Sequence, residues 1–281
     1  MTASCSFRVL AHQVTVSAPA GLLRRVNAFA GNDAEQDIPC RYQMSYSIVA
    51  GRDGFTLREE GAIFGRAAAA DDAVLALTAR LRLRILDYLA RGGWLLLQAG
   101  LATVAGRRTL LVGGPAMARA GAAARLLAGG ALVEGADVVA VRDGSAAACP
   151  FRLWLDTATA AGIDGLAQRG ELACFGGPGS ATAAAGGGAI LVADPAVFGL
   201  PWRITAGPAA ALLVLDGGRS RDAGPVVLSP QAALRAVLAA QAGSFRREGG
   251  DAVRQAACLI QSARGSLLAA NPGADLLVSA R

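Results

Sequence analysis

The amino-acid sequence predicts a mixed α/β (α+β) fold, and three observations support this. Residues 7 to 65 contain short β-like segments, a long amphipathic helix follows, and strands alternate with glycine turns and helices from Trp94 onward. Hydrophobic residues make up 53% of the 281 residues and charged residues 17%. Such a chain can bury a sizeable core, so global disorder is excluded.

The N-terminal part is expected to be a small β-rich region. Phe7–Val16 alternates partly between apolar and polar residues, and Tyr42–Val49 has strand-like composition. Phe55–Phe64 follows a turn at Gly51–Gly54. These segments predict three strands.

A helix is predicted over Asp72–Arg91, with Asp71 or Asp72 as the N-cap and Gly92-Gly93 as the stop. Apolar residues recur there at helical spacing, namely Val74, Leu77, Leu81, Ile85 and Tyr88. Arg80 and Arg84 share one face and Arg82 points elsewhere, which favours a solvated surface over an anion or partner site. We place a domain boundary after this helix, giving regions 1–92 and 93–281.

The next segment predicts a β-α-β unit. Strands are expected at Trp94–Leu97, Leu101–Val104 and Thr109–Val112, and Gly113-Gly114-Pro115 breaks the chain. Ala116–Ala128 is strongly helix-forming, Gly129-Gly130 stops it, and a strand is expected at Asp137–Val141. Such a unit can hold a phosphate at the N-terminus of its helix.

The remaining chain contains fewer strong signals. The low-complexity stretch 176–188 predicts a mobile loop. Strands are expected at Ala189–Val192, Ala210–Leu215 and Leu276–Ser279. One helix should begin at Ser229-Pro230, and another should run from Asp251 to about Arg264.

Composition narrows the functional classes. All 27 basic residues are arginine, the net charge is +6, and the arginines are scattered, so no nucleic-acid site is predicted. The longest apolar stretches, such as Ile204–Leu215, are too short to span a membrane, and no secretory signal is evident, so we expect a cytoplasmic protein. The five cysteines and the single histidine, His12, have no metal-ligand spacing, so no metal or cofactor is expected.

The glycine turn invites comparison with the P-loop pattern GxxxxGK[ST]. In that motif glycines let backbone amides surround the phosphates, the lysine reaches the β- and γ-phosphates, and the hydroxyl holds Mg²⁺. Here the segment runs from Gly113 and Gly114 to Ala120, with alanine at position 118 and Arg119 at the lysine position. The first glycine is present, whereas the second glycine, the lysine and the hydroxyl are missing.

The surrounding residues resemble the HPr serine kinase family and its HPr-kinase-related members. The similar strings are QAGLATVAGRRTLLVGG, beginning at Gln98, and RLLAGGALVEGADVVAVRDG, ending at Gly144. The match runs without a gap from about Leu95. This family shares the phosphoenolpyruvate-carboxykinase-like P-loop fold. The resemblance therefore implies such a kinase core, preceded here by the small β-rich N-terminal region.

The resemblance also assigns roles to single positions. The family histidine falls on Gln98, the lysine on Arg119 and the Mg²⁺-binding hydroxyl on Ala120. Of the family's Asp-Asp pair, the first falls on Ala136 and the second, the general base, on Asp137. Asp137 is thus a vestigial general base or a structural carboxylate, and the ATP site is degenerate.

Three functional hypotheses remain. The favoured one is a pseudokinase that acts as a non-catalytic binding or scaffolding subunit for a protein or peptide partner; the resemblance implies a peptide-modifying system. The second is a residual ATP- and Mg²⁺-dependent serine/threonine kinase with Asp137 as base. The third is a small-anion binding protein in which Arg119 holds a carboxylate or phosphate.

Overall fold

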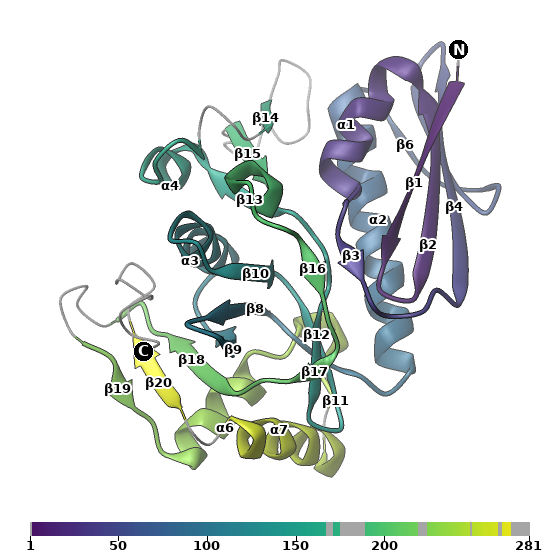
Figure 1. Cartoon of the computed structure of the whole chain (residues 1–281). Helices are drawn as coiled ribbons and strands as arrows, with labels where there is room; N and C mark the ends of the chain where they lie inside the picture. Colours follow the sequence, from purple (N-terminus) through teal and green to yellow (C-terminus); the bar gives the residue numbers. More distant parts are fainter. Residues whose placement is uncertain are drawn as a thin grey trace.

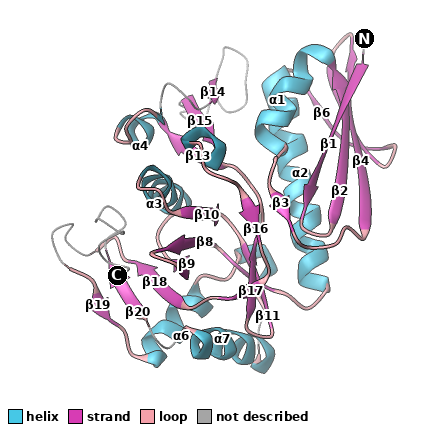
Figure 2. Cartoon of the chain, viewed as in Figure 1, coloured by secondary structure: helices cyan, strands magenta, loops and turns pink. Residues whose placement is uncertain are grey.

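The computed structural model describes residues 2–166, 171–174, 189–218, 224–247, 249–263 and 266–270. The fold is mixed α/β with several open mixed sheets, which confirms the predicted class (Figures 1 and 2). The predicted loop 176–188 and the predicted strand Leu276–Ser279 lie outside the described residues. No described helix is long and apolar enough to cross a membrane.

The N-terminal region is a five-stranded sheet covered on one face by two helices (Figure 1). The sheet order is β1-β2-β4-β5-β6, and only the β2–β4 pair is parallel. The strands are β1 (Thr2–Val9), β2 (His12–Pro19), β4 (Tyr42–Gly51), β5 (Gly54–Glu59) and β6 (Ala62–Ala67). The helices are α1 (Ala20–Ala30) and α2 (Ala70–Arg91).

Several N-terminal expectations need correction. Phe7–Val16 forms a hairpin and not one strand, because Leu10 turns the chain with a φ of 52°. The predicted strand Phe55–Phe64 is likewise two strands, β5 and β6. Helix α1 was not predicted, although Leu22, Val26 and Phe29 are buried at helical spacing. It supplies the crossover that a parallel β2–β4 pair requires.

Helix α2 spans the predicted range and ends at Gly92 as expected. The predicted aspartate cap is wrong: the N-cap is Ala69, and both aspartates lie in the first turn, where a carboxylate interacts favourably with the helix dipole. Asp71 pairs there with Arg25 of α1. Arg80 and Arg84 share a face as predicted, and both donate to Glu59 of β5.

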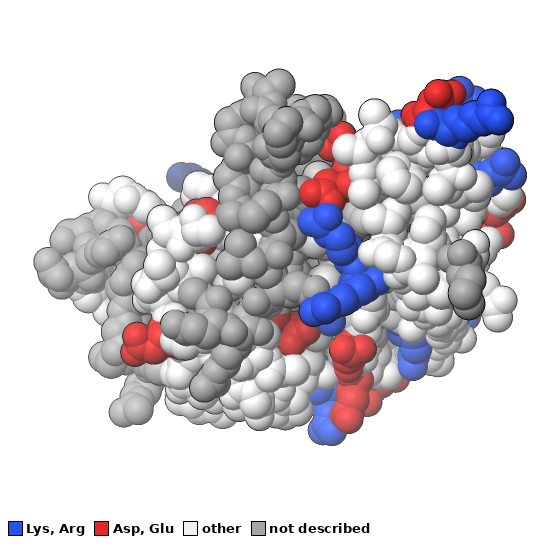
Figure 3. Space-filling view, turned by 90° about the horizontal axis from the view of Figure 1, so that it is seen from above, with Lys and Arg blue, Asp and Glu red and all other residues white. Residues whose placement is uncertain are grey.

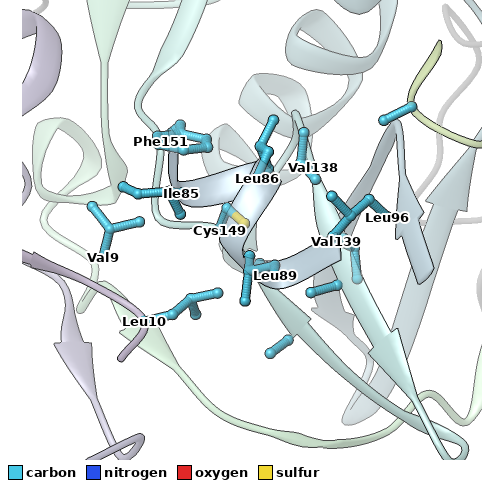
Figure 4. Close-up of a cluster of buried hydrophobic side chains, with 14 of the residues drawn as sticks. Val9, Leu10, Ile85, Leu86, Leu89, Leu96, Val138, Val139, Cys149 and Phe151 are labelled. Atoms are coloured by element: carbon cyan, nitrogen blue, oxygen red, sulfur yellow. The ribbon is translucent and has the colours of Figure 1, made fainter. Parts of the chain in front are cut away.

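Helix α2 also belongs to the core of the remaining chain. Ile85, Leu86 and Leu89 lie among side chains from both the N-terminal region and the following region (Figure 4). These neighbours include Val9 and Leu10 from the N-terminal hairpin and Val138, Val139, Cys149 and Phe151 from the following region. One cluster of buried side chains therefore crosses the proposed boundary at residue 92, and the two-region division stays a prediction.

The second region is built on a six-stranded sheet with order β10-β8-β9-β18-β20-β19. Its strands are β8 (Ala99–Val104), β9 (Arg107–Val112), β10 (Leu132–Gly135), β18 (Ala211–Leu215), β19 (Val226–Val227) and β20 (Leu267–Ala270). Helix α3 (Ala116–Ala128) has the predicted bounds and lies on one side. Helices α6 (Pro230–Ala239) and α7 (Gly250–Ser262) lie on the other (Figure 1). Ser229 caps α6 as expected, accepting from the Ala232 amide at 3.2 Å.

The β-α-β unit exists with one correction. Helix α3 leads from β9 to β10, and β8 lies between those two strands. The expected strand Asp137–Val141 is instead β11 (Val139–Arg142), which pairs in a different sheet with β7 (Leu95–Leu97) and β12 (Ser145–Ala148). The sequence pattern alone could not assign β11 to its sheet.

Small sheets and short helices complete the fold. Strand β17 (Gly207–Pro208) extends the β12-β11-β7 sheet, and β13 (Leu153–Asp156), β15 (Ala189–Ala193) and β14 (Glu171–Cys174) form another. The short helices are α4 (Thr157–Ala161), η2 (Pro195–Phe198) and η3 (Gly243–Phe245). Strand β3 (Glu35–Gln36) pairs in parallel with β16 (Arg203–Ile204) and so joins the N-terminal region to the rest. Basic and acidic side chains gather along this boundary in the view from above (Figure 3).

Candidate functional site

The sequence-predicted site residues meet at one edge of the six-stranded sheet. Strand β8 begins opposite the end of β9, since Ala99 pairs with Val112, so Gln98 and Gly113 follow on the same side. Strand β10 ends nearby, and the Ala99 amide donates to the Asp137 carbonyl at 3.2 Å. Gln98, Gly113 and Asp137 are therefore neighbours, although they are widely separated in sequence.

Local backbone geometry explains why glycines occupy the turn at Gly113 and Gly114. Gly113 and Gly114 have φ values of 86° and 65°, a conformation that favours glycine. A Cβ atom on Gly113 would stand 2.8 Å from the Leu215 carbonyl oxygen of the neighbouring strand β18. The turn geometry therefore needs no phosphate to explain it. Pro115 then acts as N-cap of α3 without a side-chain hydrogen bond.

Arg119 points back into the protein at the position that matches the P-loop lysine. Its side chain is almost fully buried, with 3% of the residue exposed. Its Nη1 donates to the Gly114 carbonyl at 2.6 Å, whereas its Nε has no partner among the described residues. Burial lowers the pKa of the Arg119 guanidinium, and the charge of Asp137 opposes that shift.

Ala120 and Gln98 offer no phosphate or metal chemistry here. Ala120 is buried in the apolar cluster under α3, so its position faces the core. Gln98 is exposed, and its backbone amide donates to the Ala240 carbonyl at 2.6 Å. Over the part of the chain that the structure describes, no three His, Cys, Asp or Glu side chains come together as metal ligands.

Asp137 is held by an arginine from the N-terminal region. Arg82 of α2 donates from Nη2 to Asp137 Oδ2, and its guanidinium lies 4.7 Å from the centre of the Phe151 ring. Both charged side chains are about one quarter exposed, at 27% and 26%. Burial, and secondarily the Asp137 charge, raise the pKa of the Cys149 thiol behind them.

Two residues at this edge escaped sequence reasoning. Arg82 was expected only to point away from Arg80 and Arg84; a contact across 55 positions leaves no local signal. Asp216 follows β18 directly, is exposed, and accepts from the Gly218 amide at 3.0 Å. Its position after an apolar strand was the available signal.

No protein-family model matches this chain, and no curated protein shows significant similarity to it. The family resemblance of residues 95–144 and the roles it assigns therefore remain predictions.

Proposed function

We propose that this chain is a catalytically degenerate HPr-kinase-related protein, a pseudokinase that acts as a non-catalytic binding or scaffolding subunit. The proposal includes a phosphoenolpyruvate-carboxykinase-like P-loop core behind the small β-rich N-terminal region. Its partner would be a protein or peptide, in keeping with the peptide-modifying setting that the resemblance implies.

The conformation of Arg119 carries this proposal. In a working P-loop the cation extends over the phosphates and the loop presents its amides to them. Here the cation turns inward to the Gly114 carbonyl and is 3% exposed. An arginine also presents a planar fork where the loop chemistry uses a compact ammonium. These features support loss of nucleotide binding.

The environment of Asp137 supports the same conclusion. A general base must be free to accept a substrate proton. Arg82 occupies Asp137 Oδ2, and the guanidinium is itself packed on Phe151. Loss of one stabilising donor typically costs roughly 10²–10³ in rate, and here the lysine, the metal-binding hydroxyl and one loop glycine are all replaced. Little phosphoryl transfer is expected to remain.

Anion binding is the second candidate, because one observation favours it. The Nε of Arg119 is buried with no acceptor among the described residues, close to the N-terminus of a 13-residue helix. A buried donor without a partner costs roughly 1–3 kcal/mol, and an anion could remove that cost. No comparable observation favours the residual kinase.

Thermal unfolding with and without ATP and Mg²⁺ tests the proposal. A ligand at a hundred times its dissociation constant stabilises by about 2.7 kcal/mol, which is several degrees. We expect no shift for the natural chain. Inorganic phosphate without ATP tests the second candidate, which predicts a shift that Arg119→Met abolishes.

A restored loop provides the matched variant. Ala118→Gly and Arg119→Lys together restore the second glycine and the lysine of the loop, and we expect this variant to gain a shift with ATP. Ala120 is left unchanged because it packs in the apolar core. A shift in the natural chain would contradict the loss of nucleotide binding. A folded double variant without any shift would contradict the P-loop origin of the turn.

A further inference from the structure

A cleft of about 1060 Å³ lies away from the glycine turn, between the N-terminal sheet and the second region. Its walls are the first residues of β4, the last turns of α2, and strands β11 and β12. This volume slightly exceeds the roughly 300–1,000 Å³ typical of small-ligand sites.

Three aromatic rings form part of this cleft. His12 and Tyr42 are paired across β2 and β4, and Tyr88 of α2 packs on both. The Tyr42 and Tyr88 ring centres are 4.3 Å apart, and the two residues are 38% and 39% exposed. Exposed tyrosines of this kind are frequent anchors in protein interfaces.

His12 lies behind the tyrosines and has an unmet hydrogen-bonding requirement. It is 1% exposed, it lines the cleft, and neither ring nitrogen has a partner among the described residues. A neutral imidazole carries one donor and one acceptor. Because the two tyrosine rings are in contact and His12 is almost fully buried behind them, a bound ligand contacts the tyrosines and not the imidazole.

The cleft also contains an open strand edge. Strand β5 pairs with β4 only from Tyr46 onward, so the first four residues of β4 extend beyond it. The Tyr42 amide donates to Ala11 on the β2 side, and Ser45 receives a bond from Glu60 on the opposite side. Successive residues of a strand direct their backbone groups to alternate edges. The amide and carbonyl of Gln43 therefore face the cleft.

Charge at the cleft is mixed. Arg84 pairs with Glu59 and Arg91 with Asp87. Arg41 and Asp37 are exposed, line the cleft and form no ion pair with any described residue. Because they are four positions apart, they can contact opposite charges on different residues of one extended ligand.

From these observations we infer that the cleft binds an extended peptide, which adds to the open edge of β4 at Gln43. This inference rests on the proposed role as a binding subunit. The peptide carries an acidic residue at Arg41, a basic residue at Asp37 and an apolar or aromatic residue between them against Tyr42 and Tyr88. Backbone bonds supply affinity and the alternate side chains supply selectivity, as in other cases of strand addition.

Selection from a display library of random ten-residue peptides tests this inference on the full chain. We expect the bound peptides to combine an acidic, an apolar and a basic residue. The best synthetic peptide should lose roughly tenfold or more in affinity with Arg41→Glu, the loss expected for one charge-assisted contact. Replacing its acidic residue by arginine should restore binding to that variant.

Two controls separate this mode from nonspecific attraction. Arg52→Glu makes the same charge change on the exposed β4–β5 turn outside the cleft and should leave binding unchanged. N-methylation of the peptide amide that faces Gln43 should weaken binding about tenfold, whereas methylation of the next amide should not. Failure to select any peptide, or binding insensitive to Arg41→Glu and to N-methylation, would overturn the inference. The ATP measurement above is independent, so the proposed loss of nucleotide binding could survive that failure.

Discussion

Two arginines flank strand β9, Arg108 near its start and Arg119 in the helix that follows its end, and the two are held in opposite ways. At its start, Arg108 donates to Glu134 through Nε and Nη2 at 2.6 and 3.0 Å, and to the carbonyls of Gly207, Ala146 and Thr205. Arg119, in helix α3 beyond the other end, donates from its side chain to the Gly114 carbonyl, and its Nε has no partner among the described residues.

This difference separates an arginine whose nitrogens all have acceptors from one that is buried with incomplete hydrogen bonding. Arg108 joins β10, β12 and the β16–β17 segment, and each of its nitrogens has an acceptor. Arg119 has few hydrogen-bond partners for a residue that is almost fully buried. Charged residues are rarely buried so deeply unless they are paired.

The largest predicted effect is therefore at Arg108. Arg108→Met leaves Glu134, whose side chain is 8% exposed, buried without its cation. Removing one partner of a buried pair typically costs about 3–5 kcal/mol, and we expect such a loss in urea unfolding. Arg203→Met removes the exposed pair with Glu35 and should leave the free energy of unfolding unchanged within error. Equal losses in the two variants would refute the structural role of Arg108.

Arg119 should be far more tolerant. Arg119→Met removes one hydrogen bond and also removes the cost of burying a guanidinium, so the free energy of unfolding should change by no more than about 1 kcal/mol. The same urea titration measures it beside Arg108→Met. A loss as large as that of Arg108→Met would mean that Arg119 clamps the turn, and the contrast between the two ends of β9 would fail.

Local signals explain what the sequence could predict. Helix α3 was predicted residue for residue because alanine-rich sequence lies between glycines, and Ser229-Pro230 marked the start of α6. The hairpin turn at Leu10 was missed because it contains no glycine, proline or asparagine, and its left-handed conformation is unusual for leucine.

Long-range geometry explains what the sequence could not predict. The glycine turn was predicted from the residues themselves and the role of Asp137 from the resemblance, but their partners come from elsewhere. Arg82 reaches Asp137 from α2, and Arg119 turns inward because the Gly114 carbonyl lies within reach. Residue identity gives the chemistry available at a position, whereas packing decides which of its atoms remain free.

His12 extends the contrast to a group that can titrate. Like Arg119 it is buried, and its ring nitrogens have no well-formed hydrogen bond to the part of the chain that the structure describes. Burial lowers the pKa of the His12 imidazole, and the nearby Val9 backbone partly opposes that shift. The folded protein therefore favours the neutral ring, whereas the unfolded chain has an ordinary pKa near 6.5. The contribution of neutral His12 to the free energy of unfolding is therefore fully present above about pH 6.5. It is lost as the pH falls below that value, since the unfolded state takes up the proton first.

The expected loss of unfolding free energy at low pH is small but can be assigned to His12. The slope for one proton cannot exceed about 1.4 kcal/mol per pH unit, and it should appear in urea unfolding between about pH 6.5 and 5, above the range in which carboxylates titrate. His12 is the only histidine, so His12→Phe, which keeps an aromatic ring beside Tyr42 and Tyr88, should flatten that window. An unchanged slope in the variant would show that the pKa of His12 is the same in the folded and unfolded chain. Another titrating group would then have to account for the pH dependence of stability.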